Sequence, residues 1–261
     1  MLRLSVVAAL ALSAGAAATF TYAQDNPVAA RAAPGAFAPL TDIEWSYATR
    51  ARDEEGRPYL RFARDGMNSA MGAENLPEAA DALAAVSSAS GGEPVAFAVT
   101  REAGVLACSG RVTGRGRAAG TCRFDPDADF VAALAAKGLV PEDIEELLGL
   151  AFVDARLASI DELSRAGFVV ADVDELTAVA ALEVTGAYAI ELRAAGLQPE
   201  DLDELVSAKA VGVEPGWIAE MAEAGYAGME MERAIELRAL GIDADYARRM
   251  ARVMRAMDGV E

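Results

Sequence analysis

The second half of this chain repeats itself at a fixed interval. Glycines recur with a period of 29 at four successive positions, and a second pair shows the same period: Gly138, Gly167, Gly196 and Gly225, then Gly212 and Gly241. A period of this length is typical of proteins that stack one small unit many times, because a single unit cannot bury its hydrophobic face alone. The repeat therefore limits this half to folds in which equivalent residues occupy equivalent places.

Each unit has the pattern of two short helices. We call Gly138, Gly167, Gly196 and Gly225 the marker glycines. In the third unit, Tyr188 and Leu192 stand eight and four residues before Gly196, on one face of a helix that ends there. In the first unit, Ile144 and Leu147 begin the apolar stripe of a second helix. An apolar residue follows every marker glycine, as expected when a left-handed glycine ends a helix and the next residue folds back. We predict an all-α, solenoid-like domain of helix-pair repeats over residues 129–261.

Several positions depart from the regular unit. Glu183 and Asp154 replace the second glycine in the earlier units, and since glutamate disfavours a left-handed backbone, we expect that turn to end later, near Gly186. Pro141 and Pro199 are expected to open the following helices. A fifth copy runs on to the C-terminus without its glycine, as a terminal capping unit would. The alternative is an irregular helical bundle whose internal similarity reflects ancestry alone.

The first half has the sequence pattern of a small β-sheet domain. Alternating apolar and polar residues and intervening turn residues indicate two strands, a helix opened by a proline, and three more strands: 45–51, 59–64, 77–86, 94–100, 104–112 and 118–124. This order predicts a small α+β domain with an antiparallel sheet over residues 41–128. Residues 24–40, rich in alanine and proline without a period, are interpreted as a flexible lead-in.

Residues 1–23 have the features of a secretory signal peptide. Arg3 precedes an apolar run over 4–20, and small residues ending at Ala23 form a cleavage site. An uncleaved anchor is the alternative, although the run is slightly short for a spanning helix. No later segment has the apolar length to span a membrane. We therefore expect an exported protein, periplasmic or extracellular.

The two cysteines, Cys108 and Cys122, flank a predicted hairpin turn near Arg115. In an exported protein, cysteines opposite one another on paired strands favour a structural disulfide. Two free buried thiols are the alternative. A redox-active pair is disfavoured because the cysteines do not have the CxxC spacing.

The composition removes many activities. The chain has no histidine, which excludes histidine-based triads and histidine-ligated zinc. Its formal net charge of −18 makes nucleic acid an unfavourable partner. Residues 125–130 place aspartates at alternate positions but lack the glycine and glutamate of a calcium loop, so a helix cap is the simpler interpretation. We predict no catalytic residue, metal or cofactor.

Two stretches, ELRAAGLQPEDLDEL and IELRALGIDADYARRM, resemble a known kind of repeat. They are similar to the tandem "LRALG" helix pairs of a group of uncharacterised exported bacterial proteins with a small β-rich domain before the helices. Similar repeats occur in the extracytoplasmic part of some BlaR-type sensor-transducers. The resemblance covers residues 95–258 and implies a role in envelope signalling or scaffolding. This chain has neither the HExxH motif nor the membrane spans of those transducers, so the resemblance implies no peptidase activity.

Two functions compete at this point. The first is an exported, non-enzymatic interaction or scaffold protein whose acidic repeats contact another envelope protein through an extended surface. The second is a module that binds a small ligand or glycan in the sheet domain, with Trp45, Tyr47 and Tyr59 as stacking residues. Aromatic residues in such positions more often form the core of the domain, and this is the favoured interpretation.

Overall fold

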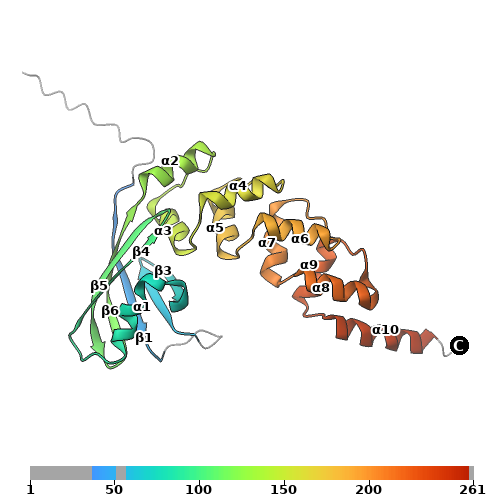
Figure 1. Ribbon diagram of the computed structural model, residues 1–261, viewed down its shortest axis with the longest axis horizontal. Coiled ribbons are helices and arrows are strands. Elements are labelled where there is room, and N and C mark those ends of the chain that lie inside the picture. Colours follow the sequence, from blue (N-terminus) through green and yellow to red (C-terminus); the bar gives the residue numbers. More distant parts are fainter. Residues whose placement is uncertain (1–36, 51–56, 259–261) are drawn as a thin grey trace, which may run out of the picture. The chain divides into compact units, whose positions relative to one another are not determined.

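The computed structural model describes residues 37–50 and 57–258. The first half of this part is a six-stranded antiparallel sheet, and the second half is helical, which confirms the α+β prediction (Figure 1). The strand order is β3-β2-β1-β6-β5-β4. Their bounds are β1 Leu40–Ala48, β2 Tyr59–Arg64, β3 Met67–Gly72, β4 Pro94–Arg101, β5 Gly104–Gly114 and β6 Arg117–Pro126. The predicted signal segment, most of the lead-in and the loop after β1 lie outside the described residues.

The third strand was not predicted. β3 pairs with β2 along its whole length, and a tight turn at Asp65 and Gly66 joins them. Both turn residues have positive φ, 45° and 93°, as the common two-residue hairpin turn requires. The Asp-Gly pair was therefore the available signal. It was missed because the strand itself, MNSAMG, has a weak hydrophobic alternation.

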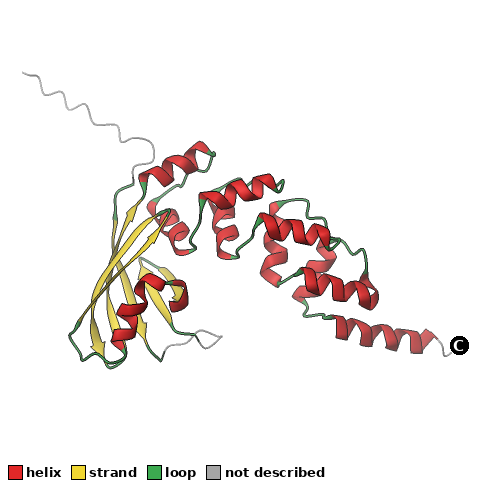
Figure 2. Ribbon diagram, viewed as in Figure 1, coloured by secondary structure: helices red, strands yellow, loops and turns green. Residues whose placement is uncertain are grey.

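One face of the sheet is covered by the predicted helix. This segment consists of two short 3₁₀ turns, η1 Ala73–Asn75 and η2 Pro77–Ala79, and then α1 Ala80–Val86 (Figure 2). Trp45 on β1 and Phe97 on β4 meet edge to face, with ring centroids 5.1 Å apart. Two strands separate β1 from β4, and a flat sheet would hold them roughly 14 Å apart. The sheet is therefore strongly curved around its core.

In the second half, helices that stand two places apart along the chain pack against each other. α4 packs on α2 and α6, α10 packs on α8, α5 packs on α3, and α9 packs on α7. A π-helical turn, Ala222–Tyr226, follows α8. The helices are α2 Ala128–Ala136, α3 Ile144–Phe152, α4 Leu157–Arg165, α5 Val173–Ala181, α6 Gly186–Ala194, α7 Leu202–Val211, α8 Pro215–Met221, α9 Met231–Ala239 and α10 Ala244–Asp258.

Three of these helices begin with the same cap. Asp143, Asp172 and Asp201, each one sequence period after the last, accept a hydrogen bond from the backbone N–H three residues later, at 2.8 to 2.9 Å. Such caps satisfy N–H groups that the first turn leaves unpaired. Pro141 and Pro199 stand two residues before these caps, outside the helices, so the prediction that they open them was wrong.

The glycines that recur with the period of 29 lie at the C-terminal ends of helices. We call the equivalent positions of successive units a column. All six glycines have positive φ, between 69° and 104°. Asp154 and Glu183 adopt the same left-handed backbone, with φ of 53° and 54°, so the expectation that the turn ends near Gly186 was wrong. The N–H of Val184 bonds back to the carbonyl of Val179 at 2.9 Å, and the Val184 side chain is buried. This burial offsets the strain at Glu183.

We expect Glu183→Gly to stabilise the protein. Glycine adopts the left-handed backbone without the steric cost that a β-carbon imposes, a difference of about 1 kcal/mol. Chemical denaturation should show the increase in the free energy of unfolding. Glu183→Ala is the control, because it removes the charge and keeps the β-carbon. An equal gain in both variants would show that charge, and not backbone strain, is the cause.

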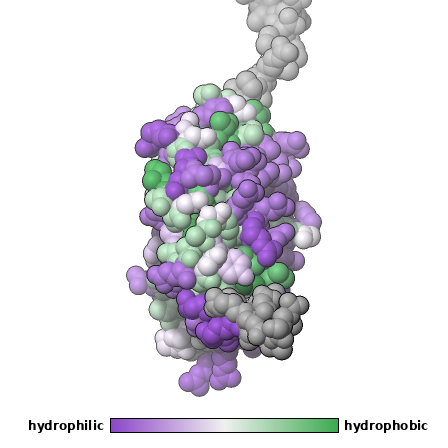
Figure 3. All heavy atoms as spheres, turned by 90° about the vertical axis from the view of Figure 1, so that its right-hand side faces the viewer, coloured by the Kyte–Doolittle hydropathy of each residue, from purple (hydrophilic) through white to green (hydrophobic). Residues whose placement is uncertain are grey.

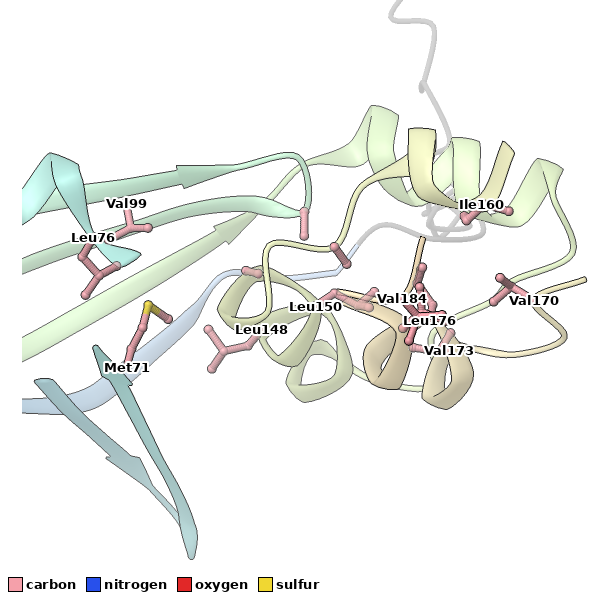
Figure 4. Packing of buried hydrophobic residues seen from close by; sticks show 14 of the residues in the cluster. Met71, Leu76, Val99, Leu148, Leu150, Ile160, Val170, Val173, Leu176 and Val184 are labelled. Atoms are coloured by element: carbon pink, nitrogen blue, oxygen red, sulfur yellow. The ribbon is translucent and has the colours of Figure 1, made fainter. Parts of the chain in front are cut away.

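The hydrophobic core continues from the sheet into the first helices. Leu148 of α3 lies beside Met71 and Val99 of the sheet (Figure 4), and Phe152 contacts Phe62 with ring centroids 5.1 Å apart. Farther along, Leu150, Ile160, Val173, Leu176 and Val184 form the core of the next helices (Figure 4). The domain boundary predicted near residue 128 therefore falls within shared packing. In the part that the structure describes, no helix has both the length and the apolarity to cross a bilayer.

Candidate functional site

Successive helix pairs are joined by hydrogen bonds that follow the sequence period. The Tyr188 hydroxyl donates to the carbonyl of Val213 at 2.7 Å, and Trp217 Nε1 donates to the carbonyl of Ile242 at 3.1 Å. The donors are one period apart, as are the acceptors. Tyr188 and Trp217 thus each fix the helix that carries them to the loop that leads into the next unit.

Cations occupy the helix ends between units. Arg193 donates to the carbonyl of Ala166 at 2.7 Å and lies over the Phe168 ring, and Arg238 donates to the carbonyl of Gly212 at 2.7 Å. Positive charge at a helix C-terminus is favourable. The two lysines have similar roles, since Lys137 pairs with Asp161 and Lys209 pairs with Glu214. These contacts give both lysines structural partners.

Burial raises the pKa of Tyr188, and the nearby charge of Glu214 adds to the effect. Because an unfolded tyrosine ionises near pH ~10, the folded protein holds this proton more tightly. The resulting stability is fully present below that pH and is lost as the pH rises above it. We expect the stability of the wild-type protein to fall between pH 8 and pH 11 more steeply than that of Tyr188→Phe. Parallel declines in urea titrations at the two pH values would contradict this.

Exposed large hydrophobic side chains are concentrated on the helical half. Of the seven such residues among the described positions, six lie there: Val140, Val169, Ile190, Leu240, Tyr246 and Met250. Val140 and Val169 are 67% and 76% exposed and stand one period apart, two positions after their marker glycines. They therefore occupy equivalent places in adjacent units. Figure 3, which looks at the molecule from the right-hand side of Figure 1, shows hydrophobic residues between hydrophilic ones on that face.

A second exposed apolar area lies on α10. Tyr246 and Met250 occupy the positions of Tyr188 and Leu192 in the fifth copy of the repeat, yet they are 42% and 40% exposed, whereas Tyr188 and Leu192 are buried. The difference arises because no unit packs on the outer side of α10 within the described part of the chain. Arg249 lies over the Tyr246 ring, 5.8 Å from its centroid.

A cavity among the described residues lies where the sheet meets the helices. Its volume is about 570 Å³, within the range of small-ligand sites. β3 and the 3₁₀ turns form one wall, and the C-terminal ends of α3 and α5 form the other. Its charged lining residues are Glu78, Arg101, Asp154, Arg156 and Glu183.

Arg101 is the central charge of this cavity. Its Nη1 pairs with Glu78 at 2.7 Å, and its Nη2 donates to the carbonyl of Asn75 at 3.0 Å. Its Nε lies 3.5 Å from Asp154 and is the one buried side-chain polar atom without a hydrogen-bond partner in the described part of the chain. Asp154 also pairs with Arg156, and this hydrogen bond raises the pKa of Arg156. The lining of the cavity thus holds an arginine that is fixed by two carboxylates and a backbone carbonyl.

The structure separates the three aromatic residues considered for ligand stacking. Trp45 is only 2% exposed, packs on Phe97 and donates from Nε1 to the carbonyl of Ser109. Tyr47 and Tyr59 are half-buried. Tyr47 lies two residues after Trp45, on the same face of the sheet, whereas Tyr59 neighbours the inward-facing Leu60 and so belongs to the opposite face. The three do not form one platform, which removes the main support for a stacking site.

Cys108 and Cys122 face each other on β5 and β6, with their Cα atoms 4.0 Å apart and their sulfurs bonded. In the sequence 125–130, Asp125 pairs with Arg123, and Asp127 caps α2 through the N–H of Phe130. No cluster of acidic, cysteine or histidine side chains with the geometry of a metal site is present over 37–50 and 57–258. Sequence reasoning missed the cavity because its lining residues come from segments far apart in the chain.

Comparison of the chain with protein-family models, with curated proteins and with solved structures finds no significant match.

Proposed function

We propose that this chain is an exported, non-enzymatic interaction protein. In this proposal the helix pairs form a solenoid-like array of units with the period of 29, and the array presents an extended surface to another envelope protein. The packing of alternate helices and the hydrogen bonds that recur with the period support such an array. The resemblance to exported repeat proteins supports a role in envelope signalling or scaffolding. The bonded cysteine pair is compatible with an oxidising, exported location.

The observation that carries this proposal is the exposure of Val140 and Val169. Two branched apolar side chains at equivalent positions of adjacent units remain in water. The helices that precede these two residues, α2 and α4, pack on each other at a typical spacing of about 8 to 10 Å, so we infer that the two valines form one apolar strip across the two units. Exposed apolar strips between polar residues are typical of protein interaction sites. The next unit has Gln198 at this position, which limits the strip to the first two units.

Site-specific crosslinking tests the proposal. A photoreactive residue at position 140 or 169, in the native envelope, should yield a defined adduct with one partner. The same residue at position 198 is the matched control and should yield much less. Val140→Asp with Val169→Asp should abolish the complex recovered by pull-down, whereas Gln198→Asp should preserve it. Equal adducts at all three positions, or none at any, would overturn the proposal.

A further inference from the structure

The outer edge of β3 is open toward the cavity beside Arg101. β3 is an edge strand, so its backbone groups face β2 and the outside alternately. The N–H of Ala73 donates to the carbonyl of Pro58, which fixes the alternation. The backbone N–H and carbonyl groups of residues 69 and 71 accordingly face β2, and those of Ala70 face outward. Ala70 is exposed and lines the cavity, so its N–H and carbonyl are available to another strand.

Both walls of the cavity carry charged side chains. Three carboxylates line the cavity, from Glu78, Asp154 and Glu183, against two arginines. Arg101 and Arg156 are engaged by Glu78 and Asp154, while no ion pair of Glu183 is present among the described residues. A cation entering the cavity would therefore meet an uncompensated carboxylate.

Two of these acidic residues stand at positions whose backbone favours glycine. Asp154 and Glu183 occupy the column that holds Gly212 and Gly241 in later units, and all four have positive φ. Glycine would relieve the strain at both acidic positions. The two units next to the cavity nevertheless carry carboxylates there, and both carboxylates line it.

From these observations we infer that the cavity between β3 and the ends of α3 and α5 binds an extended peptide segment carrying a basic side chain, which adds as a strand to the edge of β3. The backbone of Ala70 would pair with the peptide, and Glu183 would receive its lysine or arginine. This mode of recognition takes affinity from main-chain hydrogen bonds and specificity from the pocket. The site is separate from the strip at Val140 and Val169 and stands independently of the proposed function.

The test uses the full chain and a fluorescently labelled probe peptide, Thr-Val-Lys-Val-Thr, blocked at both ends. Fluorescence anisotropy should show saturable binding, and the same peptide with glutamate in place of lysine should bind at least about tenfold more weakly. Methylating the backbone nitrogens that face the protein should abolish binding, while methylating the alternate nitrogens should not. These probes leave the protein itself unchanged, so they remain informative if a variant fails to fold.

Two protein variants complete the test. Ala70→Pro should abolish binding, because it removes the outward N–H and blocks the edge, whereas Asn68→Pro is the control at the next outward position, away from the cavity lining. Glu183→Lys should weaken the lysine peptide about tenfold and strengthen the glutamate peptide. No saturable binding of the lysine peptide up to about 1 mM, or equal affinity for the lysine and glutamate peptides, would overturn the inference.

Discussion

Replacing Leu192 by alanine should lower the free energy of unfolding by about 3 kcal/mol. Leu192 is fully buried in α6, and the equivalent residues of the other units, Leu134, Leu163 and Met221, are fully buried too. Truncation removes the transfer free energy of the side chain and leaves a cavity that neighbouring units cannot fill without losing their own packing. The loss should appear in urea denaturation followed by circular dichroism at a helical wavelength.

The chain contains its own control for this prediction. Met250 holds the same column in the fifth copy but is 40% exposed. We expect Met250→Ala to cost less than about 1 kcal/mol, because little apolar area returns to water. Similar losses at the two positions would show that the outer side of α10 is covered in solution, and would contradict the exposed end that the structure shows.

Removing the disulfide should destabilise the sheet by a similar amount. The bond closes a loop with a sequence separation of 14, for which restriction of the unfolded chain contributes about 3 kcal/mol. Both cysteines are buried, so we choose the double variant Cys108→Ala with Cys122→Ala to avoid leaving unpaired polar groups. Thermal unfolding should show a lower melting temperature in the variant than in the oxidised wild-type protein.

Reduction distinguishes the bond from the packing of the two side chains. A reductant should lower the melting temperature of the wild-type protein toward that of the double variant, and it should leave the variant unchanged. If the wild-type melting temperature does not respond while free thiols become detectable, the bond contributes nothing to stability. If no thiols form at all, accessibility limits reduction, and the comparison of the two proteins under oxidising conditions decides.

Local signals made much of the fold predictable. Helix ends depend on a few residues close in sequence, so the spacing of Gly138, Gly167, Gly196 and Gly225 located the first helix of each unit. Asp143, Asp172 and Asp201 are local signals for the starts of second helices, whereas Pro141 and Pro199 precede two of these helices and do not open them. The disulfide pairing followed from hairpin geometry in the same way.

The turn at Glu183, the role of Trp45 and the cavity depend on contacts between residues far apart in the sequence, so local patterns could not predict them. Glu183 violates its local preference because burial of Val184 outweighs the strain. Trp45 looks the same in the sequence whether it stacks on a ligand or on Phe97, and only the curvature of the sheet decides. The cavity could not be predicted at all, because Arg101 meets Asp154 and Glu78 through tertiary structure.

The two ends of the helical half differ in how freely they could change. Leu148 and Phe152 of the first pair complete the interior of the sheet, and Arg64 reaches across to Glu145. Deleting that pair would uncover the sheet's interior and invite aggregation. At the other end, α10 exposes Tyr246 and Met250, whose equivalents in earlier units pack against the unit that follows. Gene duplication or loss could therefore lengthen or shorten the protein at its C-terminal side while the β-rich portion kept its shape.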